Sequence, residues 1–249
     1  MTFSDRLAEM RWLSDDTFEL DGVRYVNMDF AAKTDDHRLA VLKPRYYFEA
    51  YEEALRGERI DRMLEFGVFQ GGSTILMASL CRPEKIVAVD ICDPVAAFDS
   101  FRERNPALTQ GVVVKYNTSQ DDELALNRIF AEEFDGPIDL VIDDACHWYE
   151  ETKRSFEIAF PHLRPGGLYV IEDWHWAHDP VFDIWHDKNS PVNLLTDLML
   201  VQAARPDLID TMRISHGMAV IRKGRNAPAG GPLDIDAIRR LRGRPAPAL

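Results

Sequence analysis

The sequence has few cysteines, no long hydrophobic run and fewer cations than anions. Its 249 residues include three cysteines, and none of them forms a Cys-x-x-Cys pair. An odd number without that spacing indicates neither a disulfide framework nor a thiolate zinc site, so we expect reduced thiols. No apolar run approaches the roughly 20 residues that a membrane-spanning helix needs.

The start of the chain and its charge narrow the class of protein further. The first residues, MTFSDRLAEMRWL, lack the apolar stretch of a signal peptide, which predicts a cytoplasmic protein without a membrane partner. With 29 Lys and Arg against 42 Asp and Glu, the formal net charge is −13. Because nucleic-acid affinity comes from cations that neutralise phosphates, we expect no nucleic-acid partner. The predicted partner is a small molecule.

Two apolar runs in the second half of the chain end in acidic residues. Ile138–Ile142 and Leu168–Ile171 are short, rich in β-branched residues and bounded by turn residues, which is typical of buried strands in a parallel sheet. In an open α/β sheet, the carboxyl ends of the strands form the ligand crevice. The acids that should converge in this crevice are Asp143, Asp144, Glu172 and Asp173.

Four carboxylates in one crevice repel one another unless a cation joins them. A hard divalent cation such as Mg²⁺ takes one or two carboxylates and keeps positions for water and substrate oxygens. A helix beginning near Trp148 would hold the His147 imidazole within reach of a metal-bound hydroxyl, as a general base requires. A structural interpretation remains open, because acids after strands often cap helices and a histidine beside a tryptophan is often simply packed.

The motifs of this region resemble those of the metal-dependent sugar O-methyltransferases of macrolide biosynthesis, the macrocin and mycinamicin type. These enzymes and their cephalosporin hydroxylase-like relatives read D-D-G-S-H, then F-P-x-L-x-P-G-G-x-Y-V-I-E-D. This chain reads DDACH at Asp143–His147 and FPHLRPGGLYVIED at Phe160–Asp173. The second motif matches closely, whereas Ala145 and Cys146 replace Gly and Ser in the first. The likeness extends more weakly over about Arg62–Arg222.

The resemblance implies a function and roles for the acids. Asp144, Glu172 and Asp173 would bind Mg²⁺ or another hard divalent cation, and His147 would be the catalytic base beside Asp144. The enzyme would use S-adenosylmethionine to methylate a hydroxyl of a deoxysugar or a glycosylated natural product in antibiotic biosynthesis. A homo-oligomer is also implied.

A glycine-rich turn is the second candidate site. The expected first strand, Arg62–Phe66, runs into EFGVFQGGST before a helix at about Thr74. Glycines let the backbone approach a ligand, and a helix N-terminus offers N–H groups to a carboxylate or phosphate. The order G-x-x-x-G-G is neither a dinucleotide motif nor a P-loop, which favours S-adenosylmethionine over NAD or ATP. The candidate cofactor contacts here are Glu65, Gly67, Gly71, Gly72 and Ser73.

Further cofactor contacts are predicted after the next two strands. The strand Lys85–Ile91 contains Asp90, about twenty residues after the glycines, where an acid is expected on ribose hydroxyls. The run Val112–Tyr116 precedes NTSQDD, and in class I methyltransferases this loop lies against the adenine. The remaining candidate contacts are Ser119, Gln120, Asp121 and Asp143. Alternatively, Ser119 or Asp121 caps the helix predicted over Asp122–Phe134.

The order of elements predicts an α/β fold, the Rossmann-like class I methyltransferase fold with a doubly wound sheet of seven strands, over residues 58–224. Residues 1–57 would form an N-terminal helical cap or lid, with a short strand at Tyr25–Asn27 and a helix from Lys43 to Leu55. The segment Thr34–Arg38 is polar enough for a mobile loop or an ordinary linker.

The last part of the chain should complete the sheet. An amphipathic helix is predicted over Pro191–Ala204, two closing strands over Leu208–Ile214 and Met218–Arg222, and a loose tail over residues 225–249. The aromatic segment Trp174–Asp187 would either form a wall of the acceptor pocket or an oligomer contact.

Three other functions remain alternatives. The acceptor could be a small catechol, since a metal site of this kind suits a vicinal diol on either a sugar or an aromatic ring. A cephalosporin hydroxylase-like oxidoreductase component would need iron or a redox cofactor, and one histidine among three acids fits a 2-His-1-carboxylate iron site poorly. A non-catalytic S-adenosylmethionine-binding subunit would not need an intact set of metal ligands, which this chain retains.

Overall fold

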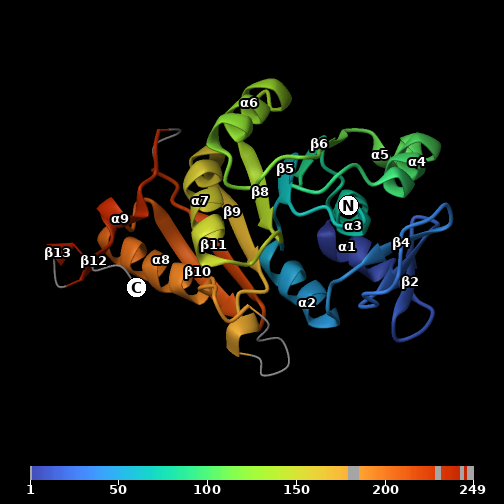
Figure 1. Ribbon diagram of the computed structural model, residues 1–249, viewed down its shortest axis with the longest axis horizontal. Helices are drawn as coiled ribbons and strands as arrows, with labels where there is room; N and C mark the ends of the chain where they lie inside the picture. The colour runs from blue at the N-terminus through green and yellow to red at the C-terminus, as the bar shows by residue number, and fades with distance from the viewer. Residues whose placement is uncertain (1, 179–184, 228–230, 242–243, 246–249) are drawn as a thin grey trace. The chain divides into compact units, whose positions relative to one another are not determined.

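The computed structural model describes residues 2–178, 185–227, 231–241 and 244–245 (Figure 1). The chain forms two compact units, Met1–Thr118 and Ser119–Leu249. In the described part of the chain, the main sheet has three strands in the first unit and four in the second. None of the described helices is long and apolar enough to cross a membrane. The segment boundaries expected at residues 57 and 224 stay predictions.

The first unit contains three parallel strands of the main sheet in the order β5-β6-β7. Their bounds are β5 Arg62–Phe66, β6 Lys85–Val89 and β7 Val112–Lys115. The helices of the same region are α3 Gly72–Cys81, α4 Ala96–Arg104 and α5 Pro106–Thr109. Phe66 pairs with Val89, and Val89 with Lys115, so the carboxyl ends of the three strands lie at one edge.

A small four-stranded sheet, which the sequence did not reveal, precedes these strands. Its order is β1-β2-β3-β4, with bounds β1 Arg11–Trp12, β2 Thr17–Leu20, β3 Val23–Asn27 and β4 Arg38–Val41. The helices of this segment are α1 Phe3–Ala8 and α2 Arg45–Ala54. The predicted strand at Tyr25 and the predicted helix α2 are both present. The cap thus contains a four-stranded sheet alongside α1 and α2, because Phe18 stacks on Tyr25 at 4.8 Å and alternate residues of β2 and β3 build their own core.

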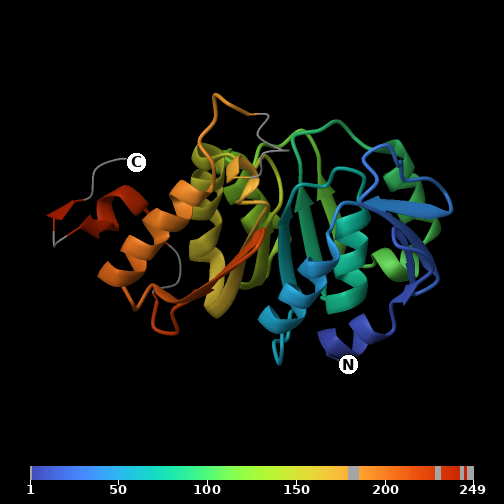
Figure 2. The same cartoon turned by 90° about the horizontal axis from the view of Figure 1, so that it is seen from below.

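Helix α3 packs directly on this small sheet, as Figure 2 shows within the first unit. Gly72, at the start of α3, lies so close to β4 that a Cβ atom at this position would be 2.0 Å from the Ala40 carbonyl oxygen. No larger residue fits there without a shift of the backbone. The second glycine of the Gly71-Gly72 pair is therefore required by packing, whatever else the turn does.

The second unit contains strands in the order β10-β11-β9-β8. Their bounds are β8 Ile138–Asp143, β9 Leu163–Glu172, β10 Ile209–Ser215 and β11 Met218–Lys223. Strands β8 and β9 are parallel, whereas β11 is antiparallel to both of its neighbours. The predicted closing hairpin is present. Every residue of β8 is buried, Asp139 and Asp143 included, and its other residues are apolar, as is typical of a strand covered on both faces.

The helices of the second unit also agree with the sequence, except at the C-terminus. They are α6 Glu123–Glu133, α7 Tyr149–Ala159, α8 Val192–Ala204 and α9 Ile235–Ile238, with short 3₁₀ turns η1 Phe160–His162 and η2 Trp176–His178. The last described strands are β12 Arg240–Leu241 and β13 Arg244–Pro245.

Part of the expected loose tail is well packed. Figure 1 shows α9 beside α8, and Ile235 is fully buried. The buried Asp197 carboxylate of α8 forms an ion pair with Arg239 and accepts a hydrogen bond from the Tyr149 hydroxyl at 2.7 Å. An unpaired buried carboxylate would be costly, so Arg239 fixes this part of the tail to α8.

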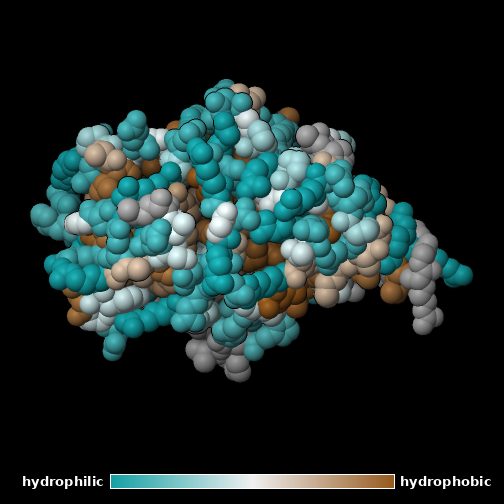
Figure 3. Space-filling model, turned by 180° about the vertical axis from the view of Figure 1, so that it is seen from behind, coloured by the Kyte–Doolittle hydropathy of each residue, from teal (hydrophilic) through white to brown (hydrophobic). Residues whose placement is uncertain are grey.

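The surface is mainly polar. Hydrophilic residues dominate the face in Figure 3, and the hydrophobic residues are confined to smaller areas between them. Among the described large hydrophobic side chains, Phe69 and Ile91 are exposed at 44% and 71%, and both lie beside the glycine-rich turn. Apolar side chains at such a position are suited to contact with a ligand.

Candidate active site

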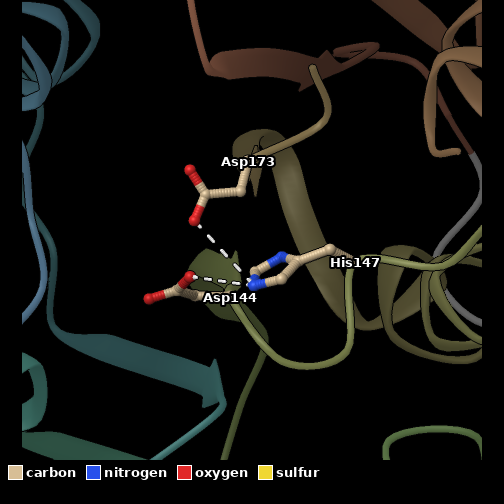
Figure 4. A group of neighbouring side chains, drawn as sticks. All are labelled: Asp144, His147 and Asp173. Atoms are coloured by element: carbon tan, nitrogen blue, oxygen red, sulfur yellow. Dashed lines mark ion pairs between the residues drawn. The ribbon is translucent and has the colours of Figure 1, made fainter. Parts of the chain in front are cut away.

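Three of the predicted site residues come together in the second unit. Figure 4 shows the side chains of Asp144, His147 and Asp173 pointing toward one another. One ligand atom from each lies within 4.8 Å of the others. The Nε2 atom of His147 is 3.9 Å from Asp144 Oδ1 and 3.9 Å from Asp173 Oδ2. This proximity arises because Asp144 follows β8 and Asp173 follows its parallel neighbour β9.

The chemistry of this group fits a hard divalent cation. Two carboxylates supply oxygen ligands and negative charge, and the imidazole can act as a nitrogen ligand or as a base. The side chains of His147, Asp144 and Asp173 are 17%, 20% and 39% exposed, so a cation and a substrate can reach them. The three residues form the one such group of three or more found in the described part of the chain.

Glu172, the third ligand implied by the sequence motif, is placed differently. It is the last residue of β9, is fully buried and lies outside the group formed by Asp144, His147 and Asp173. Its role as a ligand stays a prediction. His147 is predicted as the base, and that role stays a prediction. It also lies near enough to both acids to be a ligand.

The backbone at two of the three residues is unusual. His147 has φ 58° and Asp173 has φ 52°, which is the left-handed region that side-chain-bearing residues seldom adopt. Such a conformation costs of order 1–3 kcal/mol and persists where the surrounding structure holds it. Here the left-handed conformation lets His147, after β8, and Asp173, after β9, turn their side chains toward each other.

Asp143, predicted as a cofactor contact, is the centre of a buried hydrogen-bond network. Its carboxylate accepts hydrogen bonds from the Ser155 hydroxyl, from the Tyr169 hydroxyl at 2.7 Å and from the Gln120 side-chain amide at 3.2 Å. Burial raises the pKa of Asp143 to about 6, although the two hydroxyl donors oppose the shift. Gln120 also accepts from the Cys146 backbone N–H at 3.1 Å. Asp143 and Gln120 therefore fix the DDACH loop, and contact with a cofactor stays a prediction for both.

The loop before α6 departs from one sequence expectation. Neither Ser119 nor Asp121 caps this helix, because Asp122 is the N-cap and accepts a hydrogen bond from the Ala125 backbone N–H at 3.0 Å. The Ser119 hydroxyl donates to the Asp121 carboxylate instead. Both side chains are thus left for the predicted adenine contact, which stays a prediction.

The glycine-rich turn of the first unit is held by Asp90. The Asp90 Oδ2 atom accepts hydrogen bonds from the backbone N–H groups of Val68 at 2.6 Å and Phe69 at 3.0 Å, and Oδ1 accepts from Cys92 at 2.9 Å. Asp90 thus shapes the turn directly, and its contact with a ribose stays a prediction. Gly67 and Gly71 have φ 96° and 79°, so both need the conformational freedom of glycine.

The other predicted residues of the turn lie around the start of α3. Glu65 is fully buried and accepts a hydrogen bond from the Thr74 hydroxyl at 2.6 Å. Gly71 is the N-cap of α3, and Gly72 and Ser73 belong to its first turn, whose N–H groups have no partner within the helix. Thr34 is buried, and its hydroxyl donates to the Gln70 carbonyl oxygen at 2.7 Å. The start of the expected mobile loop is therefore fixed to the turn.

Within the aromatic segment Trp174–Asp187, of which residues 179–184 lie outside the described part, Trp176 packs inward. The Trp176 side chain is 5% exposed, and its indole N–H donates to the His147 carbonyl oxygen at 2.6 Å. The Trp185 ring lies 4.9 Å from the Trp176 ring and 6.4 Å from the His147 ring, measured between centroids. Whether the segment also forms an acceptor wall or an oligomer contact stays a prediction.

Comparisons with known proteins show which proteins the chain is similar to. A methyltransferase-domain family matches residues 64–174. Mycinamicin VI 2''-O-methyltransferase of Micromonospora griseorubida is 31% identical over 210 residues, which cover 75% of this chain and 49% of that protein. Demethylmacrocin O-methyltransferase of Streptomyces fradiae is 36% identical over 126 residues, 41% of this chain and 31% of that protein. The chain thus spans about half or less of the length of these curated relatives.

Solved structures of methyltransferases are also similar to this chain. The MycE methyltransferase from the mycinamycin biosynthetic pathway, in complex with Mg and SAH, has a TM-score of 0.57 and 30% identity, covering 75% of this chain and 52% of that one. An O-methyltransferase from Bacillus cereus, at 20% identity and a TM-score of 0.52, supports the fold alone. These similarities confirm the fold predicted from the sequence.

Proposed function

We propose that this chain, a homologue of the S-adenosylmethionine-dependent sugar O-methyltransferases with their class I fold, is itself a Mg²⁺-dependent O-methyltransferase. Its acceptor would be a sugar hydroxyl of a glycosylated natural product. The observation that carries the proposal is the group of Asp144, His147 and Asp173 at the ends of β8 and β9. A MycE structure that contains Mg, SAH and mycinamycin VI supports the same combination of ligands.

The glycine-rich turn supplies the features that the methyl donor needs. Gly67 and Gly71 allow the backbone to approach the ligand closely, and the first turn of α3 offers N–H groups to the carboxylate of the methionine moiety. The exposed Phe69 and Ile91 are suited to an apolar contact with the adenine ring. Asp90 keeps this surface in shape through its three backbone hydrogen bonds.

The acidic group supplies the features that the acceptor needs. When bound, a divalent cation at Asp144 and Asp173 would acidify the acceptor hydroxyl. His147 takes the hydroxyl proton on Nε2, which lies 3.9 Å from an oxygen of each carboxylate. The acceptor oxygen then forms a bond to the methyl carbon while the bond from that carbon to sulfur breaks, releasing S-adenosylhomocysteine. Much of the rate comes from positioning of the two reactants.

The geometry disfavours the oxidoreductase alternative. A 2-His-1-carboxylate iron site needs two histidines and one carboxylate, whereas the group described here has one histidine and two carboxylates. A methyltransferase that acts on catechols would use the same acids, so the acceptor has to be decided by experiment. Cytoplasmic localisation and a homo-oligomer also stay predictions.

A methyl-transfer assay on matched acceptors tests the proposal. The protein, S-adenosylmethionine and Mg²⁺ are incubated with a glycosylated macrolide, with its aglycone or with a catechol, and the products are analysed by mass spectrometry. We expect one added methyl group on the glycoside, located on the sugar, and none on the aglycone. Methylation of the catechol alone would assign the enzyme to small aromatic acceptors. Oxygen consumption without methyl transfer to any acceptor would reject the proposal.

A further inference from the structure

Trp176 contacts the backbone of both residues of the acidic group that have left-handed conformations. Its indole N–H donates to the carbonyl oxygen of His147 at 2.6 Å. Its own backbone N–H donates to the carbonyl oxygen of Asp173, with a longer distance of 3.4 Å. One residue therefore links the loop after β8 to the turn after β9, from which two members of the group project.

The two contacts act on the conformations that aim the side chains. A hydrogen bond to the carbonyl oxygen of a residue restricts the rotation of the following peptide, and therefore restricts ψ of that residue. His147 and Asp173 have positive φ values, which such side chains rarely adopt unless neighbouring groups hold them. If the indole released the His147 carbonyl group, the loop after β8 would be able to relax toward an ordinary conformation and turn its side chains away from the group. The backbone contact to Asp173, in contrast, does not depend on the side chain at position 176.

Trp176 is itself firmly held. Its side chain is 5% exposed, and its ring packs edge-on against Trp185 with centroids 4.9 Å apart. Asp173 is anchored separately, because its backbone N–H donates to the Gly217 carbonyl oxygen at 2.7 Å. Since both ends of the link are fixed, the position of the Trp176 indole determines where the His147 carbonyl can lie.

We propose that Trp176 is a positioning residue whose indole holds the loop of Asp144 and His147 beside Asp173, in the arrangement that binds the cation. This inference rests on the proposed function, because it assumes that Asp144, His147 and Asp173 form the metal site. It gives the buried end of the aromatic segment a role in the shape of the metal site. Trp176 is buried and supports the site from the interior.

The test is cation binding by the substrate-free protein. Trp176→Phe keeps an aromatic ring and removes the indole N–H. Mn²⁺ is a suitable probe because carboxylate-rich sites that bind Mg²⁺ also accept it, and the free ion has an electron paramagnetic resonance signal that disappears on binding. We expect Trp176→Phe to bind Mn²⁺ about 10–100-fold more weakly than the unmodified protein, because the loop that it releases also carries Asp144, and this is the usual effect of losing a partner that orients metal ligands. Binding of S-adenosylhomocysteine, measured by calorimetry, should stay unchanged.

Trp174→Phe is the matched control. Trp174 lies two residues before Trp176 in the same segment. Its indole N–H donates to the Ser215 carbonyl oxygen at 3.1 Å and not to a residue of the acidic group. Trp174→Phe should therefore bind Mn²⁺ as tightly as the unmodified protein. If Trp176→Phe does not fold, benzothienylalanine inserted at position 176 keeps the ring shape with sulfur in place of the N–H.

The outcomes separate this inference from the proposed function. If the unmodified protein binds Mn²⁺ and Trp176→Phe binds it equally well, the positioning role is wrong and the metal site stands. An equal loss in Trp174→Phe would also overturn the inference, because a general disturbance of the segment would then explain both results. If the unmodified protein binds no Mn²⁺, the metal site itself fails and the inference fails with it.

Discussion

Asp144→Asn and Asp173→Asn should each weaken Mn²⁺ binding by more than about 100-fold and reduce methyl transfer in step. An amide has nearly the shape of a carboxylate but lacks its negative charge, and only two carboxylates are present in the described acidic group. Loss of an outer partner of a metal ligand already costs about 10–100-fold, and loss of a charged ligand should cost more. Titration with Mn²⁺, monitored by electron paramagnetic resonance, measures the loss of cation binding. The assay with a glycosylated macrolide measures the loss of methyl transfer.

Two further variants make this prediction specific. Asp210→Asn removes an exposed acid from β10 of the same unit and should leave Mn²⁺ binding unchanged. Glu172→Gln tests the ligand that the motif implies but that lies outside the group. If Glu172→Gln loses the cation while Asp144→Asn and Asp173→Asn keep it, the assignment of the site to these two acids is refuted.

His147→Gln should lower turnover by about 10²–10⁴-fold, the usual range for loss of a general base, without abolishing cation binding. Glutamine is similar in length and polarity but does not accept the proton. The residual rate should rise with pH, because hydroxide in solution can then remove the proton from a hydroxyl that is already acidified. Steady-state rates across a pH series, with saturating Mg²⁺, measure both effects.

The position of His147 makes two contrary results informative. Its Nε2 atom lies 3.9 Å from an oxygen of each acid, near enough for the imidazole to be a ligand. If His147→Gln loses Mn²⁺ affinity and activity together, His147 is a ligand and another group is the base. If turnover near neutral pH equals that of the unmodified protein, His147 has no catalytic role.

The strands of the main sheet were predictable because most of them are buried on both faces. The predicted strand Arg62–Phe66 coincides with β5, and β6, β7 and β8 differ from the predicted runs by two residues or fewer at their ends. Most positions in such strands are apolar, so the run itself marks the element. Strand β9 begins at Leu163, five residues before the predicted start, because a Pro-Gly-Gly sequence that normally indicates a turn lies within it.

The small sheet of the first unit was not predictable in the same way. Its strands have two to five residues, and β2 and β3 alternate more buried with less buried side chains. Alternation over so few residues is a weak signal, and the parallel pairing of β3 with β4 depends on contacts distant in sequence. The packed residues around α9 were missed for a related reason, since the ion pair between Arg239 and Asp197 joins parts of the chain 42 residues apart.

For the site, the sequence indicated the residue types but not how they are held. The acids after β8 and β9 and the histidine three residues after Asp144 were visible as a spaced motif. Positive φ values at His147 and Asp173 could not be read from the sequence, because Asp and His adopt such values more often than most residues but still seldom. The hydrogen bonds from Trp176 and Gln120 to the DDACH loop depend on tertiary packing. The sequence therefore placed Gln120 among cofactor contacts and could not assign Trp176.

The most direct test of metal-dependent methyl transfer is to measure the reaction with and without a chelator. The protein, S-adenosylmethionine and a glycosylated macrolide are incubated in excess chelator, and Mg²⁺ is then added back. Binding of S-adenosylhomocysteine is measured in parallel. We predict that the chelator abolishes methyl transfer, that cofactor binding survives and that Mg²⁺ restores turnover. Full methyl transfer in excess chelator would contradict a metal role for Asp144 and Asp173.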